Sequence, residues 1–279
     1  MTDVDPTPEW LRLNRMNWDE RAGIHAASEF YGVHEFPARG STLRSFEPGE
    51  VGEVSGRSLL HLQCHMGQDT LSWARRGARA VGLDFSEPAI RTARELAEEV
   101  GLAGETRFVV SDVHDAGTAL PGDRFDIVYT GLGALVWLPD LVRWAEIVAS
   151  LLNPGGFLYL VEFHPLSDML GDDGRAVERD YFDTGGNVVD YRYTYTGGPA
   201  MTNTRQVQWQ HPLGEVLTAL ARAGLRLDFL HEHDITLFRR FPVLENTGGE
   251  YRFPPGHPRV PLLYSLRATK VTDHPASDH

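Results

Sequence analysis

The sequence predicts an α/β fold in which helices cover both faces of a mostly parallel sheet. In the middle of the chain, short apolar segments alternate with segments of helical periodicity. The first apolar segment runs into a glycine-containing turn and a helix, and the second ends on an acid followed by a helix-capping serine. The carboxyl ends of such strands are where ligands bind, so we expect the functional residues there.

The elements can be placed in order along the chain. Ser86 is a suitable helix N-cap, Pro88 suits the first turn of that helix, and the NPGG stretch at 153–156 ends a later one. The predicted strands are residues 58–64, 78–84, 106–112, 124–131 and 157–163, and the predicted helices are 68–76, 86–100 and 139–152.

The pattern changes after the fifth strand. Residues 164–210 form a polar, glycine-rich and aromatic-rich insertion, within which DYRYTYT (190–196) alternates and places Tyr191, Tyr193 and Tyr195 on one face. TNTRQVQWQ (202–210) is the expected partner strand, which predicts a β-hairpin lid. A helix over 212–223, strands over 225–233 and 262–270, and a disordered tail after residue 271 complete the expected chain.

Charge and composition exclude several partner classes. The formal net charge of −13 repels phosphate backbones and anionic lipid headgroups, and no basic cluster opposes it, so we expect neither a nucleic acid nor a membrane partner. No apolar run approaches the roughly 20 residues of a membrane span, and the N-terminus does not resemble a signal peptide. The lone Cys64 excludes an intramolecular disulfide. We expect a cytoplasmic monomer or homodimer that acts on a small molecule.

Acids stand at the ends of the second and third predicted strands. Asp84 follows Gly67 at close to the roughly 20-residue spacing of nucleotide-binding folds, where a carboxylate accepts hydrogen bonds from ribose hydroxyls. Its alternative role, helix capping, is already filled by Ser86. Asp112 can accept from an exocyclic amine such as that of adenine, or it can be a turn acid.

The ordered segments LLHLQCHMGQDT, AVGLDFS, VVSDVHD, FDIVYTG and LLNPGGFLYLVE resemble the successive motifs of class I S-adenosylmethionine-dependent methyltransferases. The resemblance covers residues 57–163 and implies a Rossmann-like, seven-stranded sheet with an antiparallel last strand. It implies S-adenosylmethionine as cofactor and a small organic acceptor, with specialised metabolism as a candidate setting. The implied cofactor residues are Gly67 and Thr130 on the methionine and methyl-transfer side, Asp84 on the ribose, Phe85, Asp112 and Val113 on the adenine, and Gln63, Asp69 and Ser86 in the same loops.

Gln63 and His65 depart from this family pattern, because they stand where glycines are usual. A residue other than glycine requires an ordinary φ at such a place, or strain. The Gln63 amide either contacts the methionine end of the cofactor or hydrogen-bonds within the turn. The missing glycines also disfavour a pyrophosphate-containing dinucleotide, which needs close backbone approach.

Methyl transfer requires a general base only if the acceptor binds protonated. The candidate bases are His164, directly after the fifth strand, and His25 in the N-terminal cap, whereas His211 is expected to begin a helix. His231 and His233 share a face, but no cysteine partners accompany them and we predict no metal site.

Aromatic residues gather outside the predicted sheet core. Such a surface excludes water and shapes an acceptor site, or it packs the hairpin or a dimer contact. The predicted substrate residues are Trp18, Tyr31, Trp137, Tyr193 and Trp209, and Tyr181, Tyr191 and Tyr195 belong to the same group.

Two other functions compete with methyl transfer. They are cyclisation of the cofactor with release of methylthioadenosine, and non-catalytic cofactor binding.

The expected chain has five parts. They are a cap (1–56), a cofactor-binding half (57–164), a lid insertion (165–211), the completion of the core (212–270) and a tail (271–279).

Overall fold

The computed structural model describes residues 7–271, so most of the predicted tail and the first six residues of the predicted cap lie outside the described residues. The chain divides into two compact units. The first unit comprises the residues up to Asp123 together with Gly186–Gln208, and the second comprises Arg124–Gly185 together with the residues from Trp209 onward. None of the described helices is both long and apolar enough to span a membrane.

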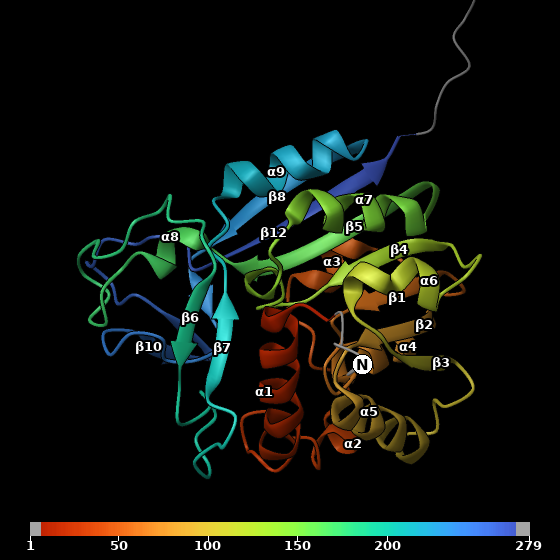
Figure 1. Ribbon diagram of the computed structural model, residues 1–279, viewed down its shortest axis with the longest axis horizontal. Helices are drawn as coiled ribbons and strands as arrows, with labels where there is room; N and C mark the ends of the chain where they lie inside the picture. The colour runs from red at the N-terminus through yellow and green to blue at the C-terminus, as the bar shows by residue number, and fades with distance from the viewer. Residues whose placement is uncertain (1–6, 272–279) are drawn as a thin grey trace, which may run out of the picture. The chain divides into compact units, whose positions relative to one another are not determined.

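The main sheet has seven strands in the order β3-β2-β1-β4-β5-β12-β8 (Figure 1). β1, β2 and β3 pair in parallel, as do β4 and β5, whereas β12 pairs antiparallel with both β5 and β8. This confirms the predicted Rossmann-like sheet with an antiparallel last strand.

The elements of the first unit are α1 Glu9–Ala26, α2 Phe36–Arg39, α3 Glu47–Val51, β1 Ser58–Leu62, α4 Gln68–Arg75, β2 Arg79–Asp84, α5 Glu87–Glu99, β3 Thr106–Val110, the 3-10 turn η1 Val113–Asp115, α6 Ala116–Ala119, β6 Asn187–Asp190 and β7 Arg205–Gln208. Those of the second unit are β4 Phe125–Thr130, the 3-10 turn η2 Leu135–Trp137, α7 Leu141–Leu151, β5 Leu152–Phe163, α8 Pro165–Asp168, α9 Leu213–Arg222, β8 Leu225–His233, β9 Ile235–Thr236, β10 Glu245–Thr247, β11 Glu250–Arg252 and β12 Leu263–Lys270.

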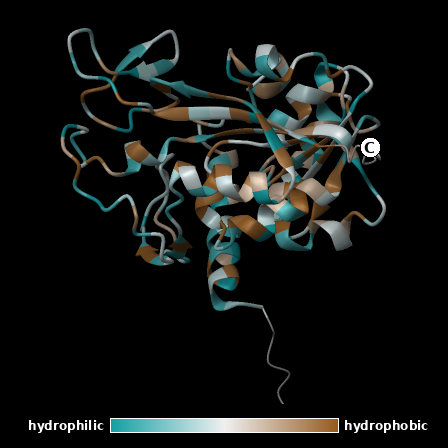
Figure 2. Ribbon diagram, turned by 90° about the horizontal axis from the view of Figure 1, so that it is seen from above, coloured by the Kyte–Doolittle hydropathy of each residue, from teal (hydrophilic) through white to brown (hydrophobic). Residues whose placement is uncertain are grey.

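Local sequence explains where the helices begin. The Ser86 hydroxyl accepts from the Ala89 N–H at the start of α5, with Pro88 in the first turn, and Asp140 caps α7 by accepting from the Arg143 N–H at 3.0 Å. α7 then buries Trp144 and Val148 at helical spacing. Figure 2 shows hydrophobic segments along the strands and on the helices packed on them.

The hairpin differs from the prediction. β6 is Asn187–Asp190, paired antiparallel with β7 so that Asn187 faces Gln208, and residues 191–196 are a loop, not a strand. The Thr194 hydroxyl donates to the Gly197 carbonyl at 3.1 Å and accepts from the Thr196 N–H at 3.2 Å. Such local side-chain bonds compete with strand pairing, and they turn the chain before the alternating tyrosines can form a ladder.

Candidate functional site

The loop between β1 and α4 is built around two residues in the left-handed backbone region. Gln63 has φ 56° and His65 has φ 49°. Residues other than glycine at these positions could have had an ordinary negative φ or a strained positive φ, and the structure shows the strained conformation at both. L-residues enter this region at a cost of about 1–2 kcal/mol each. Strain of this kind is concentrated at functional sites, which makes the loop a candidate site.

Asp84 ties this loop to the end of β2. Its Oδ2 accepts from the His65 N–H and its Oδ1 accepts from the Ser86 N–H, both at 2.9 Å. Burial raises the pKa of the Asp84 carboxyl to about 6, although the two N–H donors oppose that shift. Each oxygen of the Asp84 carboxylate accepts one hydrogen bond in this way. Each oxygen therefore keeps a lone pair that can accept from a further donor.

Gly67 has a packing role. Its φ is +73°, and a Cβ there would lie 2.6 Å from Phe108 Cε1 and 2.8 Å from Ala93 Cβ. Glycine is therefore required by the contact of the turn with the core, the role of helix–strand packing glycines in nucleotide-binding folds. The predicted approach of the cofactor to Gly67 stays a prediction.

The remaining predicted cofactor residues of the first unit surround these loops. Asp112 Oδ1 accepts from the His114 N–H and lies 2.8 Å from His114 Nδ1, which is the turn-capping role weighed as its alternative. Val113 is buried and Phe85 is half-buried. Asp69, in the first turn of α4, accepts a hydrogen bond from the Thr42 hydroxyl.

An aromatic and imidazole cluster forms beside the loop. His25 Nδ1 lies 3.1 Å from His65 Nε2, and the His25 ring stacks on Tyr31 at 4.8 Å. Trp18 meets both imidazoles edge-on, at 5.8 Å and 5.2 Å between ring centroids. The Tyr195 hydroxyl contacts the Tyr31 hydroxyl. The structure thus joins Trp18, His25, Tyr31 and Tyr195, which the sequence made candidates for the acceptor site, with His65, which it did not.

Burial keeps both histidines of this cluster neutral at pH 7. Loss of hydration lowers the pKa of His25 to about 2 and that of His65 to about 3, and the Arg21 guanidinium lowers both further. Arg21 is itself buried, donates to Gln206 Oε1 at 2.7 Å, and lies 5.1 Å from the Trp18 ring.

Polar contacts join α1 to the hairpin within the first unit. The Asn14 side chain accepts from the Val207 N–H at 2.7 Å and donates to the Val207 carbonyl at 2.9 Å, as a neighbouring strand would. Asn17 donates to the Asn203 carbonyl at 2.6 Å, and Glu20 accepts from the Thr202 and Asn203 N–H groups. The hairpin is therefore anchored to α1, as their adjacent positions in Figure 1 also show.

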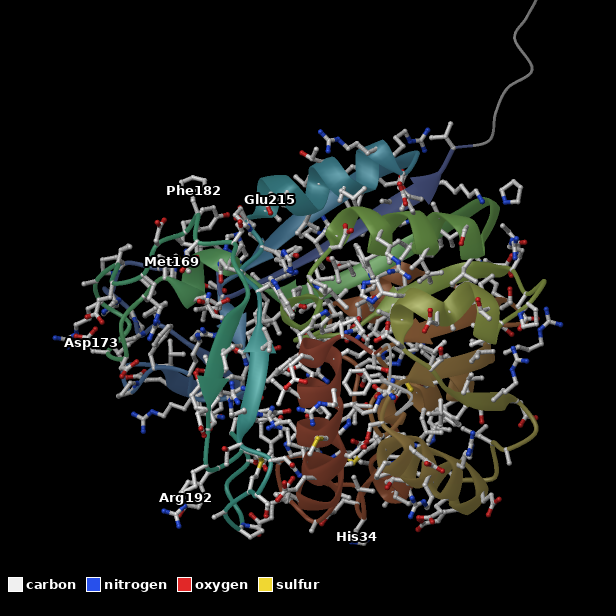
Figure 3. All side chains as sticks on the ribbon, viewed as in Figure 1. His34, Met169, Asp173, Phe182, Arg192 and Glu215 are labelled. Carbon is white, nitrogen blue, oxygen red and sulfur yellow. The ribbon has the colours of Figure 1, made fainter. Side chains whose placement is uncertain are left out.

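Tyr193 does not join the cluster. It is 55% exposed and lies in the loop beyond β6, with the Arg192 guanidinium 5.8 Å from its ring. Figure 3 shows Arg192 pointing outward at the end of this loop. Tyr195, in the same loop, is the one of these two tyrosines whose contacts with the cluster are found among the described residues.

In the second unit, both ring nitrogens of His164 are engaged. Nδ1 accepts from the Leu166 N–H at 3.1 Å and caps α8, and Nε2 lies 3.0 Å from Glu232 Oε1. His211 lies just before α9, with Nε2 2.9 Å from the Leu138 carbonyl oxygen. These contacts give His164 and His211 structural roles.

Glu162 was not singled out from the sequence. It is 6% exposed and accepts four backbone N–H bonds, of 2.6–2.9 Å, from Gly133, Ala134, Leu135 and Phe163. Burial still raises the pKa of its carboxyl to about 7. Glu162 therefore holds the loop after β4, and the only local sequence signal was an acid at the end of an apolar strand.

The other predicted residues of the second unit are placed separately. Thr130 is fully buried at the end of β4, and its hydroxyl has no hydrogen-bond partner among the described residues. Trp137 is buried in η2, and the Trp209 N–H donates to the Val136 carbonyl at 2.9 Å.

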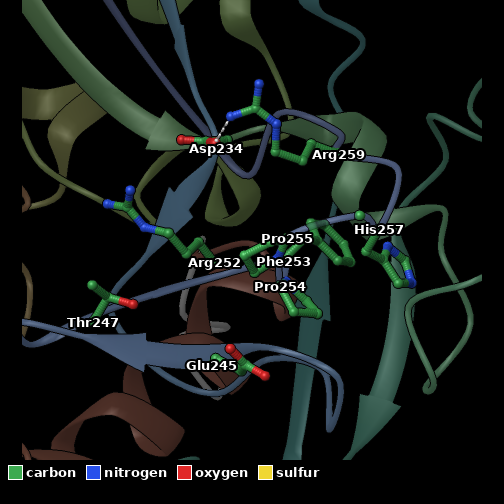
Figure 4. Close-up of a pocket in the computed structure, with 10 residues that line it drawn as sticks. Asp234, Glu245, Thr247, Arg252, Phe253, Pro254, Pro255, His257 and Arg259 are labelled. Atoms are coloured by element: carbon green, nitrogen blue, oxygen red, sulfur yellow. Dashed lines mark hydrogen bonds and ion pairs between the residues drawn. The ribbon is translucent and has the colours of Figure 1, made fainter.

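A hollow of about 430 Å³ in the second unit lies beside β10 and β11 (Figure 4). Its arginines are paired, Arg259 with Asp234 and Arg252 with Glu250, so it offers little for chemistry. No three metal-ligand side chains converge within residues 7–271.

Comparison with known proteins is consistent with this geometry. A model of the methyltransferase domain matches residues 59–156. The chain is 28% identical over 166 residues to a ubiquinone biosynthesis O-methyltransferase of Leptothrix cholodnii, covering 57% of this chain and 64% of that protein. It is 32% identical over 109 residues to the enzyme of that name from Bordetella bronchiseptica, covering 39% and 44%. The chain thus spans less than two thirds of the length of these curated relatives.

Two solved structures share the fold. The CcbJ methyltransferase of Streptomyces caelestis superimposes with a TM-score of 0.61 at 16% identity, covering 93% of this chain and 99% of that one. An S-adenosylmethionine-dependent methyltransferase of Mesorhizobium loti gives 0.57 at 22% identity, covering 86% and 99%.

Proposed function

We propose that the protein transfers a methyl group from S-adenosylmethionine to a small organic acceptor, and the match of residues 59–156 to a model of the methyltransferase domain supports this proposal. The single observation that supports this most is Asp84, a desolvated carboxylate held by two backbone N–H groups at the end of β2. An acceptor of that kind suits two neighbouring ribose hydroxyls.

The cofactor residues are proposed on the same basis. Asp84 binds the ribose, Phe85 flanks the adenine, and Asp112 and Val113 address its edge. Asp112 Oδ1 is used by the turn, so its other oxygen is the one for the adenine amine. The cofactor supplies an activated methyl group, and Gln63, Gly67 and Asp69 line the loop expected at its methionine end.

The acceptor is proposed to bind against the cluster of Trp18, His25 and Tyr31, which offers aromatic surface and one buried imidazole. His25 Nε2 is buried and has no hydrogen-bond partner among the described residues. Because burial lowers the pKa of His25 to about 2, this nitrogen suits a proton that becomes strongly acidic during methylation, such as that of a hydroxyl whose oxygen bonds to the methyl carbon. His164 Nε2, in contrast, lies 3.0 Å from the Glu232 carboxylate. The main contribution of the protein is to hold donor and acceptor in line, an effect worth about 7–11 kcal/mol.

Titration calorimetry with S-adenosylmethionine and S-adenosylhomocysteine tests the proposal first. We expect binding of both, and no binding by folded protein would refute it. Incubation with cofactor labelled in the methyl group and with cell extract, followed by mass spectrometry, then identifies the acceptor. Release of methylthioadenosine instead would show cyclisation, and binding without turnover would show a non-catalytic module.

A further inference from the structure

His65 makes two contacts that link different parts of the first unit. Its backbone N–H donates to Asp84 Oδ2 at 2.9 Å, and its side chain Nε2 lies 3.1 Å from His25 Nδ1. One residue thus connects the acid proposed for the cofactor with the imidazole proposed for the acceptor.

The surroundings of His25 fix the plane of its ring but not its tautomer. Tyr31 stacks on the ring with 24° between the planes, and Trp18 and His65 meet it edge-on. Which ring nitrogen carries the proton is set by the hydrogen bond that the other nitrogen makes. For His25 that bond is the one between its Nδ1 and His65 Nε2.

His65 also occupies a backbone conformation that glycine adopts at lower cost. At φ 49° the turn gains nothing from a side chain, and glycine would relieve the strain. An imidazole retained there, with its nitrogen directed at a second buried imidazole, indicates a role for the side chain.

We propose that His65 is a positioning residue for the transfer reaction: its Nε2 accepts the proton of His25 Nδ1–H and so leaves the lone pair of His25 Nε2 directed toward the acceptor. This rests on the proposed function. As the acceptor atom bonds to the methyl carbon, the sulfur–methyl bond breaks and its electron pair remains on sulfur. The proton of the acceptor passes to His25 Nε2, and the imidazolium formed keeps its bond to His65.

The matched variants are His65→Gly and Gln63→Gly. Both remove a side chain from a left-handed position of the same loop, but only the first removes the partner of His25. His65→Gln is the conservative variant, since the amide oxygen of glutamine reaches about as far as Nε2, and Gln63 shows that glutamine adopts this backbone conformation.

The first readout needs no acceptor. Long-range proton–nitrogen NMR spectra of the imidazoles report the tautomer of His25 at pH 7. We expect the Nδ1–H form in the unmodified protein, in Gln63→Gly and in His65→Gln, and a mixture of both tautomers in His65→Gly. The titratable and charged groups that face His25 are Arg21, Tyr31, His65 and Tyr195, and of these His65 and Arg21 lower its pKa. An unchanged tautomer in His65→Gly, or the Nε2–H form in the unmodified protein, overturns the proposal.

The second readout is turnover of labelled cofactor with the acceptor fraction of an extract. His65→Gly is expected to lower kcat at least about 100-fold with little change in KM for the cofactor, and His65→Gln recovers part of the loss. Gln63→Gly, in the loop proposed at the methionine end of the cofactor, is expected instead to raise KM for the cofactor. Equal effects of the two glycine variants would contradict the positioning role. Absence of cofactor binding would refute the proposed function, whereas the NMR result still decides the role of His65.

Discussion

Asp84 and His65 are joined by a hydrogen bond of 2.9 Å from the His65 N–H to Asp84 Oδ2. The carboxylate thus binds the strained loop and remains the proposed ribose acceptor. Because its pKa is raised to about 6, its charge changes within an accessible pH range.

We therefore expect the affinity for S-adenosylmethionine to fall as pH drops through 6. The ionised carboxylate is the acceptor, so affinity should decrease about tenfold between pH 7 and pH 5. Asp84→Asn should cost about 1–3 kcal/mol of binding free energy at pH 8 and remove this pH dependence. Calorimetry over this range is the measurement, with the exposed Asp123→Asn as control. A slope that persists in Asp84→Asn would assign the titration to another group.

The two glycines Gly67 and Gly101 allow strain and steric overlap to be separated. Their φ values are nearly the same, +73° and +72°. A Cβ added at Gly101 would have no heavy atom within 4 Å, whereas a Cβ added at Gly67 would overlap Phe108 and Ala93. Gly101→Ala should cost about 1 kcal/mol of unfolding free energy, and Gly67→Ala at least about 2 kcal/mol more. Urea unfolding measures both, and equal losses would show that the core accommodates the methyl group.

Glu162 is expected to make stability depend on pH. Its pKa is raised from 4.5 to about 7, so the folded state binds its proton more tightly than the unfolded chain does. The contribution of this group is full below pH 4.5 and is lost as pH rises through 7, a fall of about 3 kcal/mol.

Glu162→Gln should remove this slope and lower stability most at pH 4, because its amide N–H groups face backbone donors. Denaturant unfolding from pH 4 to pH 8 tests this against the exposed Glu146→Gln. A variant that keeps the parent slope would show that Glu162 is not its source.

Asn14 holds the hairpin through both backbone groups of Val207. Asn14→Ala leaves that buried N–H and carbonyl without their partner and should cost about 2–4 kcal/mol. Arg12→Ala, which removes an exposed ion pair with Glu9 from the same helix, should change stability by less than about 1 kcal/mol. Hydrogen exchange at the Val207 amide should accelerate in Asn14→Ala only, and unchanged protection there would show that the hairpin is held by other contacts.

Much of the fold was predictable because its causes are local. β8, Leu225–His233, matches its predicted range, and the start of α5 follows from Ser86 and Pro88. The predicted hairpin strand was wrong because alternation alone did not reveal the hydrogen bonds of Thr194 with its near neighbours, which turn the chain.

The site was predictable only in part. Asp84 stands at a strand end, a position that the order of elements defines, and His25 and Trp18 were candidates because of their chemistry. The pairing of His25 with His65 was not accessible, because it joins residues 40 positions apart in the chain. The role of Glu162 depends on the loop after β4. That loop is far from Glu162 in sequence, but its backbone N–H groups donate to the Glu162 carboxylate in the folded protein.

The sequence by itself determined the alternating sheet, the helix boundaries and the acids at the strand ends, because apolar periodicity and capping act over a few residues. Only the tertiary structure decided that Gln63 and His65 adopt left-handed conformations, that Gly67 serves packing, and that Tyr195 rather than Tyr193 meets the cluster. Those outcomes depend on which distant side chains fill the same space, and close packing settles that only once the chain has folded.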